Sequence, residues 1–114
     1  MNGELAEGLN RVTLVGYLGR APEMRYTPSG KPVTSFSIVT TYTWVSSNME
    51  IQKETDWFNV VAWGGLAEAC KQTLTQGQRI YLEGRIRTRR WDDEHHISHS
   101  RAEVVAQGVI SLDS

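Results

Sequence analysis

The sequence predicts an all-β protein, a small five-stranded barrel with one short helix between the third and fourth strands. Apolar and polar residues alternate with a period of two over most of its 114 residues, as half-buried strands require. Between Gly64 and Gly77 the apolar residues recur instead at three- and four-residue intervals, which indicates a short amphipathic helix. Turns rich in glycine, proline and serine separate the predicted strands.

The first two strands are predicted before residue 45. The first begins at Leu9, and Gly16 and Gly19 occur where a long strand of a small barrel must bend sharply. A short extended piece over 23–26 lies between two proline-containing turns. The second strand, residues 32–44, is dense in Val, Thr, Ile and aromatic residues, which favour strands. The residues of the first strand that are expected to face the core are Val12, Leu14, Gly16 and Leu18.

The later elements follow from the same two periods. In order, they are a polar loop over 46–53, a third strand over 55–63, a helix over 66–74 closed by Gly77, a fourth strand over 79–88, a charged hairpin tip over 91–99 and a fifth strand over 100–112. This element order is that of an OB-fold, a partly open five-stranded Greek-key barrel. An SH3-like barrel is the nearest alternative, but it would not normally hold a helix of this length between its third and fourth long strands.

Composition indicates one domain and gives no global attraction to polyanions. Residues 1–8 lack periodicity and are predicted to be a flexible arm before an OB-fold domain over 9–114. The net charge is −1, yet the stretch from Arg79 to Arg90 holds five arginines and one acid. Cys70 is the only cysteine, so no internal disulfide can form. With no apolar run that could span a bilayer and no secretory or organellar leader pattern, we expect a soluble intracellular protein.

The fourth strand carries the clearest functional pattern. Its predicted core face consists of Ile80, Leu82, Gly84, Ile86 and Thr88. The opposite face is a line of arginines between the rings of Tyr81 and Trp91, with Glu83 as its one carboxylate. Guanidinium groups that bind phosphates, beside rings on which bases stack, suit a protein that holds single-stranded nucleic acid. The simpler interpretation is the solvated polar face of an ordinary strand.

The four tryptophans strengthen the nucleic-acid interpretation. Trp57 and Trp63 are six residues apart, so they share one face of the third strand, whereas Phe58, Val60 and Ala62 take the other. Turning the two tryptophans inward would expose apolar residues that are well suited to the core. We therefore expect at least two of the tryptophans to stack on bases. The full set is Trp44, Trp57, Trp63 and Trp91.

Three segments, LNRVTLVGYLGRAPEMRYTPSGKPV, ETDWFNVVAWGGLAE and GQRIYLEGRIRTRRW, resemble the bacterial and mitochondrial single-stranded DNA-binding protein family. The resemblance runs from about Leu9 to Leu112. It implies an OB-fold homotetramer that binds single-stranded DNA without sequence preference during replication, recombination and repair. It also implies that the chain has no enzymatic activity and needs no cofactor. The expected location is the cytoplasm, in association with the nucleoid, or the mitochondrial matrix for an organellar member.

The resemblance also implies roles for individual residues. Aromatic residues at the positions of the four tryptophans stack on bases in the family, and Arg87, Arg89 and Arg90 match its basic run. The residues expected to contact phosphates are Arg85, Arg87, Arg89, Arg90, Arg11, Arg25 and Lys31. Val15 and Tyr17 are candidates for pairing between subunits. Bacterial members usually continue into an acidic tail that recruits replication and repair proteins. Because the sequence stops at Ser114 without one, we expect a truncated chain or a tailless member.

The residues also suggest other functions, which their spacing and chemistry favour less. His95, His96 and His99 come near one another in a hairpin, but they complete no familiar zinc-ligand spacing, and we expect no metal. Residues 92–94 suit a solvated charge run better than a catalytic carboxylate pair. An OB-fold protein-interaction module of the primosome or replication-restart type shares the barrel but can lose the tryptophans. An RNA-binding OB domain would use the same rings and arginines, and it stays open.

Overall fold

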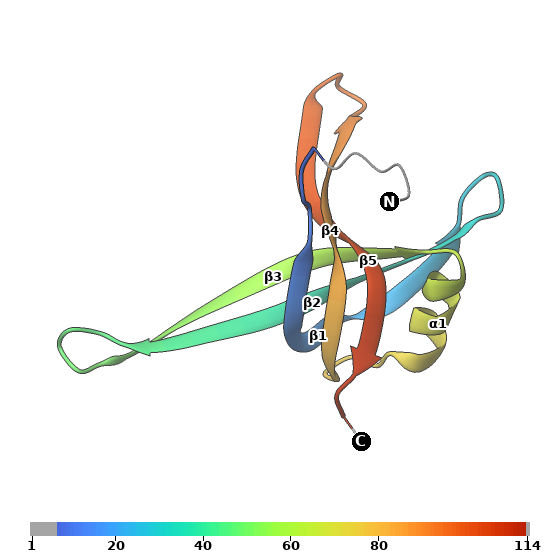
Figure 1. Ribbon diagram of the computed structural model, residues 1–114. Helices are drawn as coiled ribbons and strands as arrows, with labels where there is room; N and C mark the ends of the chain where they lie inside the picture. The colour runs from blue at the N-terminus through green and yellow to red at the C-terminus, as the bar shows by residue number, and fades with distance from the viewer. Residues whose placement is uncertain (1–6, 114) are drawn as a thin grey trace.

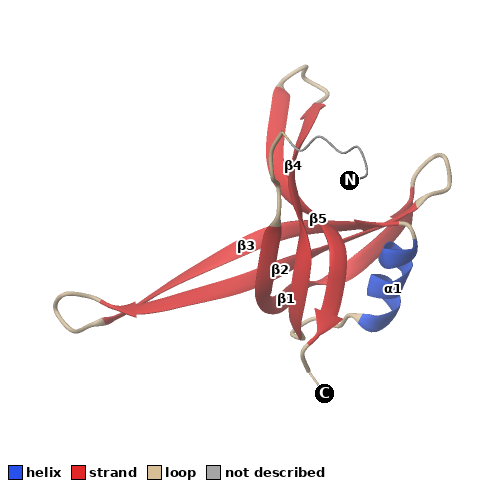
Figure 2. Cartoon of the chain, viewed as in Figure 1, coloured by secondary structure: helices blue, strands red, loops and turns tan. Residues whose placement is uncertain are grey.

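The computed structural model of the protein describes residues 7–113 and shows a closed five-stranded barrel with one helix (Figures 1 and 2). The elements are β1 (Val12–Tyr26), β2 (Pro32–Val45), β3 (Ile51–Trp63), α1 (Gly65–Thr73), β4 (Arg79–Asp92) and β5 (Ser98–Ser111). The strands close in the order β1-β2-β3-β5-β4, and β4 returns to pair with β1. Every pair is antiparallel except β3 with β5. The predicted OB-fold is confirmed.

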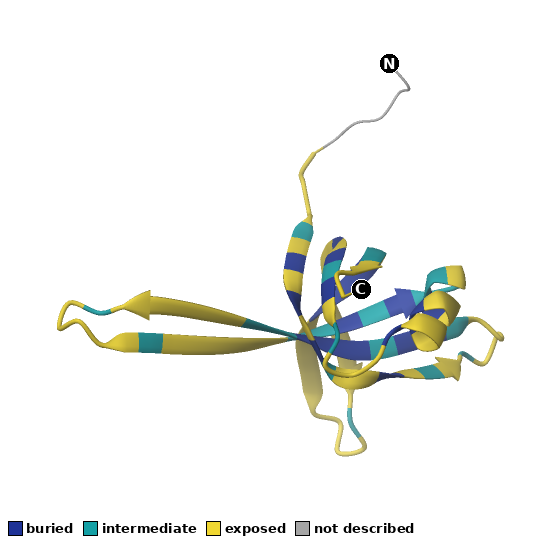
Figure 3. Cartoon of the chain, turned by 90° about the horizontal axis from the view of Figure 1, so that it is seen from below, coloured by how far each residue is buried: buried dark blue, intermediate teal, exposed yellow. Residues whose placement is uncertain are grey.

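The core fills the barrel from its alternate inward residues, as the blue bands in Figure 3 show. The predicted core faces of β1 and β3 are confirmed, because Leu14, Leu18, Val60 and Ala62 are all buried. The short helix packs on the barrel through Ala67 and Cys70. The inner residues of the other strands that are buried in this core are Phe36, Ile38, Ile80, Leu82, Val104 and Ala106.

The helix is held to β2 by a buried hydrogen bond. The Thr34 hydroxyl donates to the carbonyl oxygen of Ala67 at 2.7 Å. Gly64, which precedes the helix, has a φ of 64°, so it occupies the left-handed region that favours glycine. The predicted closure by Gly77 was wrong, because the helix ends at Thr73. Gly77, with a φ of 86°, instead lies in the turn that leads into β4.

β1 is one continuous strand, so the separate short piece predicted over 23–26 was wrong. The strand turns along the barrel through two register shifts on either side of Arg20, where the pairing with β2 skips residues. Gly16 permits the close approach of β2, because a Cβ there would lie 2.3 Å from the carbonyl oxygen of Val39. The bend is therefore absorbed by bulges in the ladder and requires no break in the strand.

Two hairpins extend beyond the barrel, and sequence patterns misplaced their limits. The polar loop predicted over 46–53 is shorter, because β3 begins at Ile51, which pairs with Val45. The strand predicted to end near Thr88 continues to Asp92, and β5 already begins at Ser98, so the tip predicted over 91–99 is also shorter. Outside the barrel both faces of a two-stranded ribbon meet water, so the alternation that marks a half-buried strand disappears.

The predicted core face of β4 was wrong for its last two residues, for the same reason. Ile86 and Thr88, which were predicted to point into the core, are exposed. They follow Gly84, the last fully buried position of the strand, on the part of β4 that leaves the barrel with β5. Of the predicted N-terminal arm over 1–8, residues 1–6 lie outside the described residues. Within 7–113, no helix is long and apolar enough to cross a membrane.

Candidate nucleic-acid interface

A groove of about 320 Å³ lies on the outer surface of the barrel, over β1, β2, β3 and the β4–β5 hairpin. Five arginines line it, and within the groove they face a single carboxylate. The full lining is Arg20, Arg25, Val33, Ser35, Asn59, Val60, Val61, Trp63, Arg87, Arg89, Arg101 and Glu103. The whole chain has a net charge of −1, but the lining of this groove is strongly basic. Such a local concentration of positive charge attracts polyanions.

Trp63 is the aromatic residue of this groove. The Lys31 ammonium nitrogen lies 5.3 Å from the centroid of its ring, and the Arg87 guanidinium carbon lies 5.9 Å from it. Both distances lie within the range of a cation–π interaction. Lys31 reaches the ring because Val33 pairs with Trp63 across the β2–β3 ladder. The groove thus presents a flat ring with cations beside it, a combination that suits a stacked base and its phosphates.

One of the two cations at Trp63, Arg87, is bound by the buried carboxylate of Glu103. Arg87 on β4 and Glu103 on β5 are cross-strand partners, and the Arg87 guanidinium donates to the Glu103 carboxylate. The Glu103 side chain is only 2% exposed, whereas that of Arg87 is 37% exposed. Because a buried carboxylate needs a partner, this ion pair fixes the direction of Arg87 and leaves its outer edge accessible in the groove.

Trp57 lies beside the groove and is 63% exposed. It lines a second depression together with Asn59 and Glu103, which also line the groove, so the two hollows adjoin. A Cβ on Gly19 would lie 2.5 Å from the Trp57 ring, so this glycine makes space for the indole against β1. The register pairs Trp57 with Val39 and Trp63 with Val33, which places both tryptophans on one face, as predicted.

Trp44 occupies a different position. It pairs with Gln52 near the end of the β2–β3 hairpin and has the opposite parity to Val39, the partner of Trp57. The register therefore places Trp44 and Trp57 on opposite faces of the ribbon. The Trp44 ring stacks on Tyr42, with centroids 5.6 Å apart. Tyr42 is an aromatic residue of this arm that the sequence interpretation missed.

Trp91 lies on β4 beside the tip of the second hairpin. The Arg89 guanidinium carbon lies 5.3 Å from its ring centroid. The His99 imidazole, its cross-strand partner on β5, stacks on it with centroids 5.4 Å apart. A further depression of about 400 Å³ is lined by Trp91, His99 and neighbouring residues of the tip. This tip therefore carries aromatic surface separate from that of the groove.

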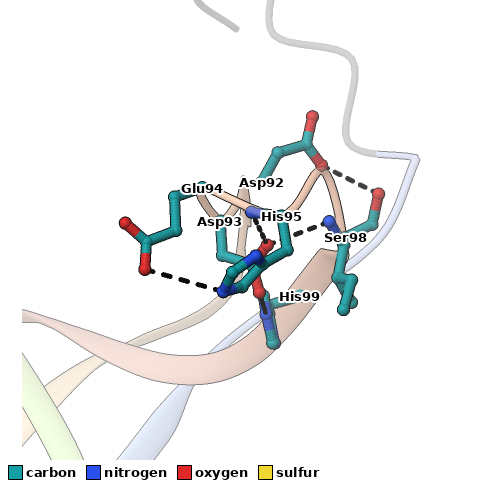
Figure 4. Close-up of polar contacts among 7 residues, drawn as sticks. Asp92, Asp93, Glu94, His95, Ser98 and His99 are labelled. Atoms are coloured by element: carbon teal, nitrogen blue, oxygen red, sulfur yellow. Dashed lines mark hydrogen bonds and ion pairs between the residues drawn. The ribbon is translucent and has the colours of Figure 1, made fainter.

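The contacts of the tip are organised around Asp93, as Figure 4 shows. Its Oδ1 accepts hydrogen bonds from the backbone N–H groups of His95 and Ile97 at 2.8 and 3.0 Å. Its Oδ2 lies 2.8 Å from Nε2 of His99. The hydrogen bond with His99 is the main reason that the pKa of Asp93 falls below its ordinary value, and the backbone donors add to it. The Asp93 carboxylate thus accepts two backbone donors of the turn and also contacts His99.

The predicted phosphate-contacting residues divide into two groups. Arg25, Arg87 and Arg89 line the groove, and Lys31 reaches it through Trp63. The structure does not bring the other three to this groove. Arg11 lies near Tyr81, Arg85 pairs with Val105, and Arg90 lines the depression at the hairpin tip. Arg90 also has the opposite parity to Arg87 and Arg89 along β4.

Arg20 and Arg101 line the groove but were missed by sequence reasoning. Arg101 is the cross-strand partner of Arg89, so it adds a second guanidinium beside a predicted one. The sequence shows only that Arg101 lies on the strand after the hairpin. The register of the β4–β5 ladder decides which face of the strand its side chain takes. Asn59 and Ser35 supply polar groups on the groove surface.

The three histidines do not form a metal site. Nε2 of His99 lies 2.8 Å from the Asp93 carboxylate, and Nε2 of His95 lies 3.7 Å from the Glu94 carboxylate. His96 has a φ of 61°, which places it in the turn. Among residues 7–113, no group of three His, Cys, Asp or Glu side chains is arranged to hold a metal ion.

The fold and this site define an OB-fold barrel with a basic, aromatic surface groove. Residues 9–112 match the sequence profile of the single-strand binding protein family. Because this match covers nearly the whole chain, the chain belongs to that family.

Individual relatives agree with this assignment. The chain is 46% identical over 89 residues to single-stranded DNA-binding protein 1 of Chlorobaculum tepidum. The aligned region covers 78% of this chain and 55% of that protein. The chain thus spans about half the length of this relative.

Solved structures show the same barrel. The Plasmodium falciparum SSB in complex with ssDNA superposes with a TM-score of 0.84 and 26% identity, covering 96% of this chain and all of that one. A deletion mutant of the single-stranded DNA binding protein from Thermus aquaticus gives a TM-score of 0.82 and 29% identity, covering 96% of this chain and 53% of that one.

Proposed function

We propose that this chain binds single-stranded DNA without sequence preference, through bases stacked on its tryptophans and phosphates bound by its arginines. The observation that carries the proposal is Trp63, with Lys31 and Arg87 at its ring in a groove of five arginines. The family, and the relatives named for single-stranded DNA binding, support it. In this proposal the chain is a binding protein without enzymatic activity.

Binding proceeds by electrostatic capture and then stacking. The arginines neutralise phosphates and release condensed counterions, so affinity falls with salt by a slope of about −0.7 for each phosphate neutralised. Trp63 and the adjoining, exposed Trp57 then hold bases in an unpaired state. Each stacked base contributes roughly 1–3 kcal/mol. Duplex DNA binds poorly because its bases are stacked on one another and unavailable to the rings.

The cellular role follows from this binding. The chain protects and organises single-stranded DNA during replication, recombination and repair, and it acts in the cytoplasm at the nucleoid, or in the mitochondrial matrix. Replication and repair proteins would be its further partners.

The assembly belongs to the same proposal, as a homotetramer. Away from the groove, the outer face of β1, β4 and β5 carries Val15, Tyr17, Tyr81 and Ile110, three of them exposed large hydrophobic residues. Val15 pairs with Tyr81, and Tyr81 pairs with Ile110, so these residues form one continuous strip. Burial of such a strip between subunits is favourable. Light scattering at micromolar concentration should give four times the chain mass, and a monomer mass would contradict this part of the proposal.

The test of binding is a tryptophan-fluorescence titration with oligo(dT) at low and high salt. Quenching that saturates on single strands, and weakens with salt, is the expected result. Duplex DNA and oligo(U) of equal length are the controls, and tighter binding of oligo(U) would favour an RNA-binding role instead. If a folded protein gave neither quenching nor a shift in electrophoretic mobility, the proposed function would be wrong.

A further inference from the structure

The β4–β5 hairpin tip carries a ring pair in which the proposed function gives a role to Trp91 but none to His99. Trp91 and His99 are cross-strand partners, and their rings stack at 5.4 Å between centroids with 19° between their planes. The His99 side chain is 42% exposed. Because the rings are stacked, the imidazole covers part of one indole face and offers its own outer face to a ligand on that side.

The imidazole is fixed in this position by its second contact. Nε2 of His99 lies 2.8 Å from Oδ2 of Asp93, whose other oxygen accepts two backbone N–H groups of the turn. The Asp93 side chain is 29% exposed, so its bonds are partly shielded from water. A side chain held by a ring stack on one side and a carboxylate on the other loses little further entropy when a ligand binds.

We propose that His99 is a base-stacking residue for single-stranded DNA, and that Asp93 is the residue that positions it. The inference rests on the proposed DNA binding and extends it from the groove to the hairpin tip. Trp91 and His99 line the depression of about 400 Å³ at this tip, which Arg90 also lines. A base seated there extends the stack on the outer face of the imidazole, while the Arg90 guanidinium is available for its phosphate.

The charges around the ring pair are compatible with this role. On β4, Arg89 contacts Trp91 and Arg90 lines the depression, and on β5 Arg101 pairs with Arg89. Two of the three acids of the tip have close local partners, since Asp93 contacts His99 and Asp92 accepts a hydrogen bond from the Ser98 hydroxyl at 2.8 Å, whereas Glu94 is 87% exposed. These bonds favour the charged form of the two carboxylates and direct them toward donors of the turn.

The experiment compares two oligonucleotides of equal length, oligo(dT) and a chain of abasic sites, which has the same phosphates but no bases. His99→Ala should weaken binding to oligo(dT) roughly fivefold or more and leave binding to the abasic chain unchanged. His99→Phe, which keeps a ring, should restore most of the loss. The matched control is His95→Ala, which removes a histidine from the same tip that stacks on no ring. Circular dichroism checks that each variant keeps the barrel.

Asp93→Ala tests the positioning role. It should weaken oligo(dT) binding in the wild-type background and have no further effect in the His99→Ala background, because Asp93 acts through the imidazole. Wild-type affinity of His99→Ala for oligo(dT), or equal losses on both oligonucleotides, would overturn the inference. A wild-type protein that fails to bind oligo(dT) would overturn the proposed function itself, and the inference with it.

Discussion

Arg87 binds the carboxylate of Glu103, its partner across the β4–β5 ladder, and the same guanidinium lies 5.9 Å from the ring of Trp63. The pair joins the barrel to the groove, because Glu103 is buried and Arg87 is partly exposed. A carboxylate among five arginines opposes phosphate binding by its charge and assists it by orienting one of them. These two effects can be separated by substitution.

Glu103→Gln should reduce the free energy of unfolding by about 1–2 kcal/mol, since a charge-assisted hydrogen bond becomes a neutral one. At low salt it should also bind oligo(dT) more tightly, because the groove loses its one negative charge. Urea denaturation and a fluorescence titration measure the two effects. Glu54→Gln, on the exposed β2–β3 hairpin, is the control with the same change of charge. Weaker binding at every salt concentration would mean that the orientation of Arg87 matters more than the charge.

Trp57→Ala should weaken binding to every single-stranded sequence by about 1–3 kcal/mol, the contribution of one base stack. The barrel should remain folded, because this side chain is 63% exposed. Titrations with oligo(dT) and oligo(dC) measure the loss, and Trp57→Phe is the matched control that keeps a ring. The stacking mechanism would be wrong if Trp57→Ala and Trp91→Ala both kept wild-type affinity.

Arg101→Gln should change the salt dependence of binding. If this arginine neutralises one phosphate, the slope of log affinity against log salt becomes less steep by about 0.7. The measurement is a series of oligo(dT) titrations between low and high salt. Lys71→Gln, which removes the same charge from α1, should leave the slope unchanged because Lys71 does not line the groove. Equal slopes for wild type and Arg101→Gln would exclude a phosphate contact by Arg101.

Gly16→Ala should destabilise the barrel by roughly 1–3 kcal/mol or more, as other forms of overpacking do. The added Cβ would meet the backbone carbonyl of Val39 at 2.3 Å, and a backbone atom cannot move aside without shifting β2. Thermal unfolding followed by circular dichroism measures the change. Gly65→Ala is the control, because a Cβ at that helix position meets no heavy atom within 4 Å. A wild-type melting temperature for Gly16→Ala would contradict the close approach of β1 and β2.

The fold was predictable because the barrel buries one face of each strand. Apolar residues therefore recur at every second position of the sequence. The limits of the two hairpins were not, since Val45 and Ile51 pair where both faces of the ribbon are exposed. There the ladder is held by backbone hydrogen bonds, and the side chains carry no consistent alternation.

The site was predictable where it is local in sequence. Arg87 and Arg89 lie on the strand whose alternation is clear, and both line the groove. Arg101 was missed because its place beside Arg89 depends on the register of the β4–β5 ladder, and a slip of one residue would move it to the other face. The approach of Lys31 to Trp63 likewise depends on the pairing of β2 with β3.

The thiol of Cys70 should react slowly with alkylating reagents in the folded protein. Burial raises the pKa of its thiol from 9.0 to about 11, so almost no thiolate exists at pH 8, and the side chain is also inaccessible. Iodoacetamide should therefore modify the native protein far more slowly than the urea-unfolded chain, as mass spectrometry can measure. Rapid alkylation of the native protein would show that the helix α1 opens readily.

The pH dependence of stability follows from the same shift. A thiol whose pKa is higher in the folded state contributes stability that is fully present below pH 9.0 and is lost as the pH rises through about 11. Cys70→Ala should remove this loss, so its unfolding free energy should fall less than that of the wild type between pH 9 and 11. The Tyr81 hydroxyl, whose pKa is raised chiefly by its hydrogen bond to Glu83, titrates in both proteins and cancels in the comparison. Parallel curves of stability against pH would mean that the thiol does not remain buried in solution.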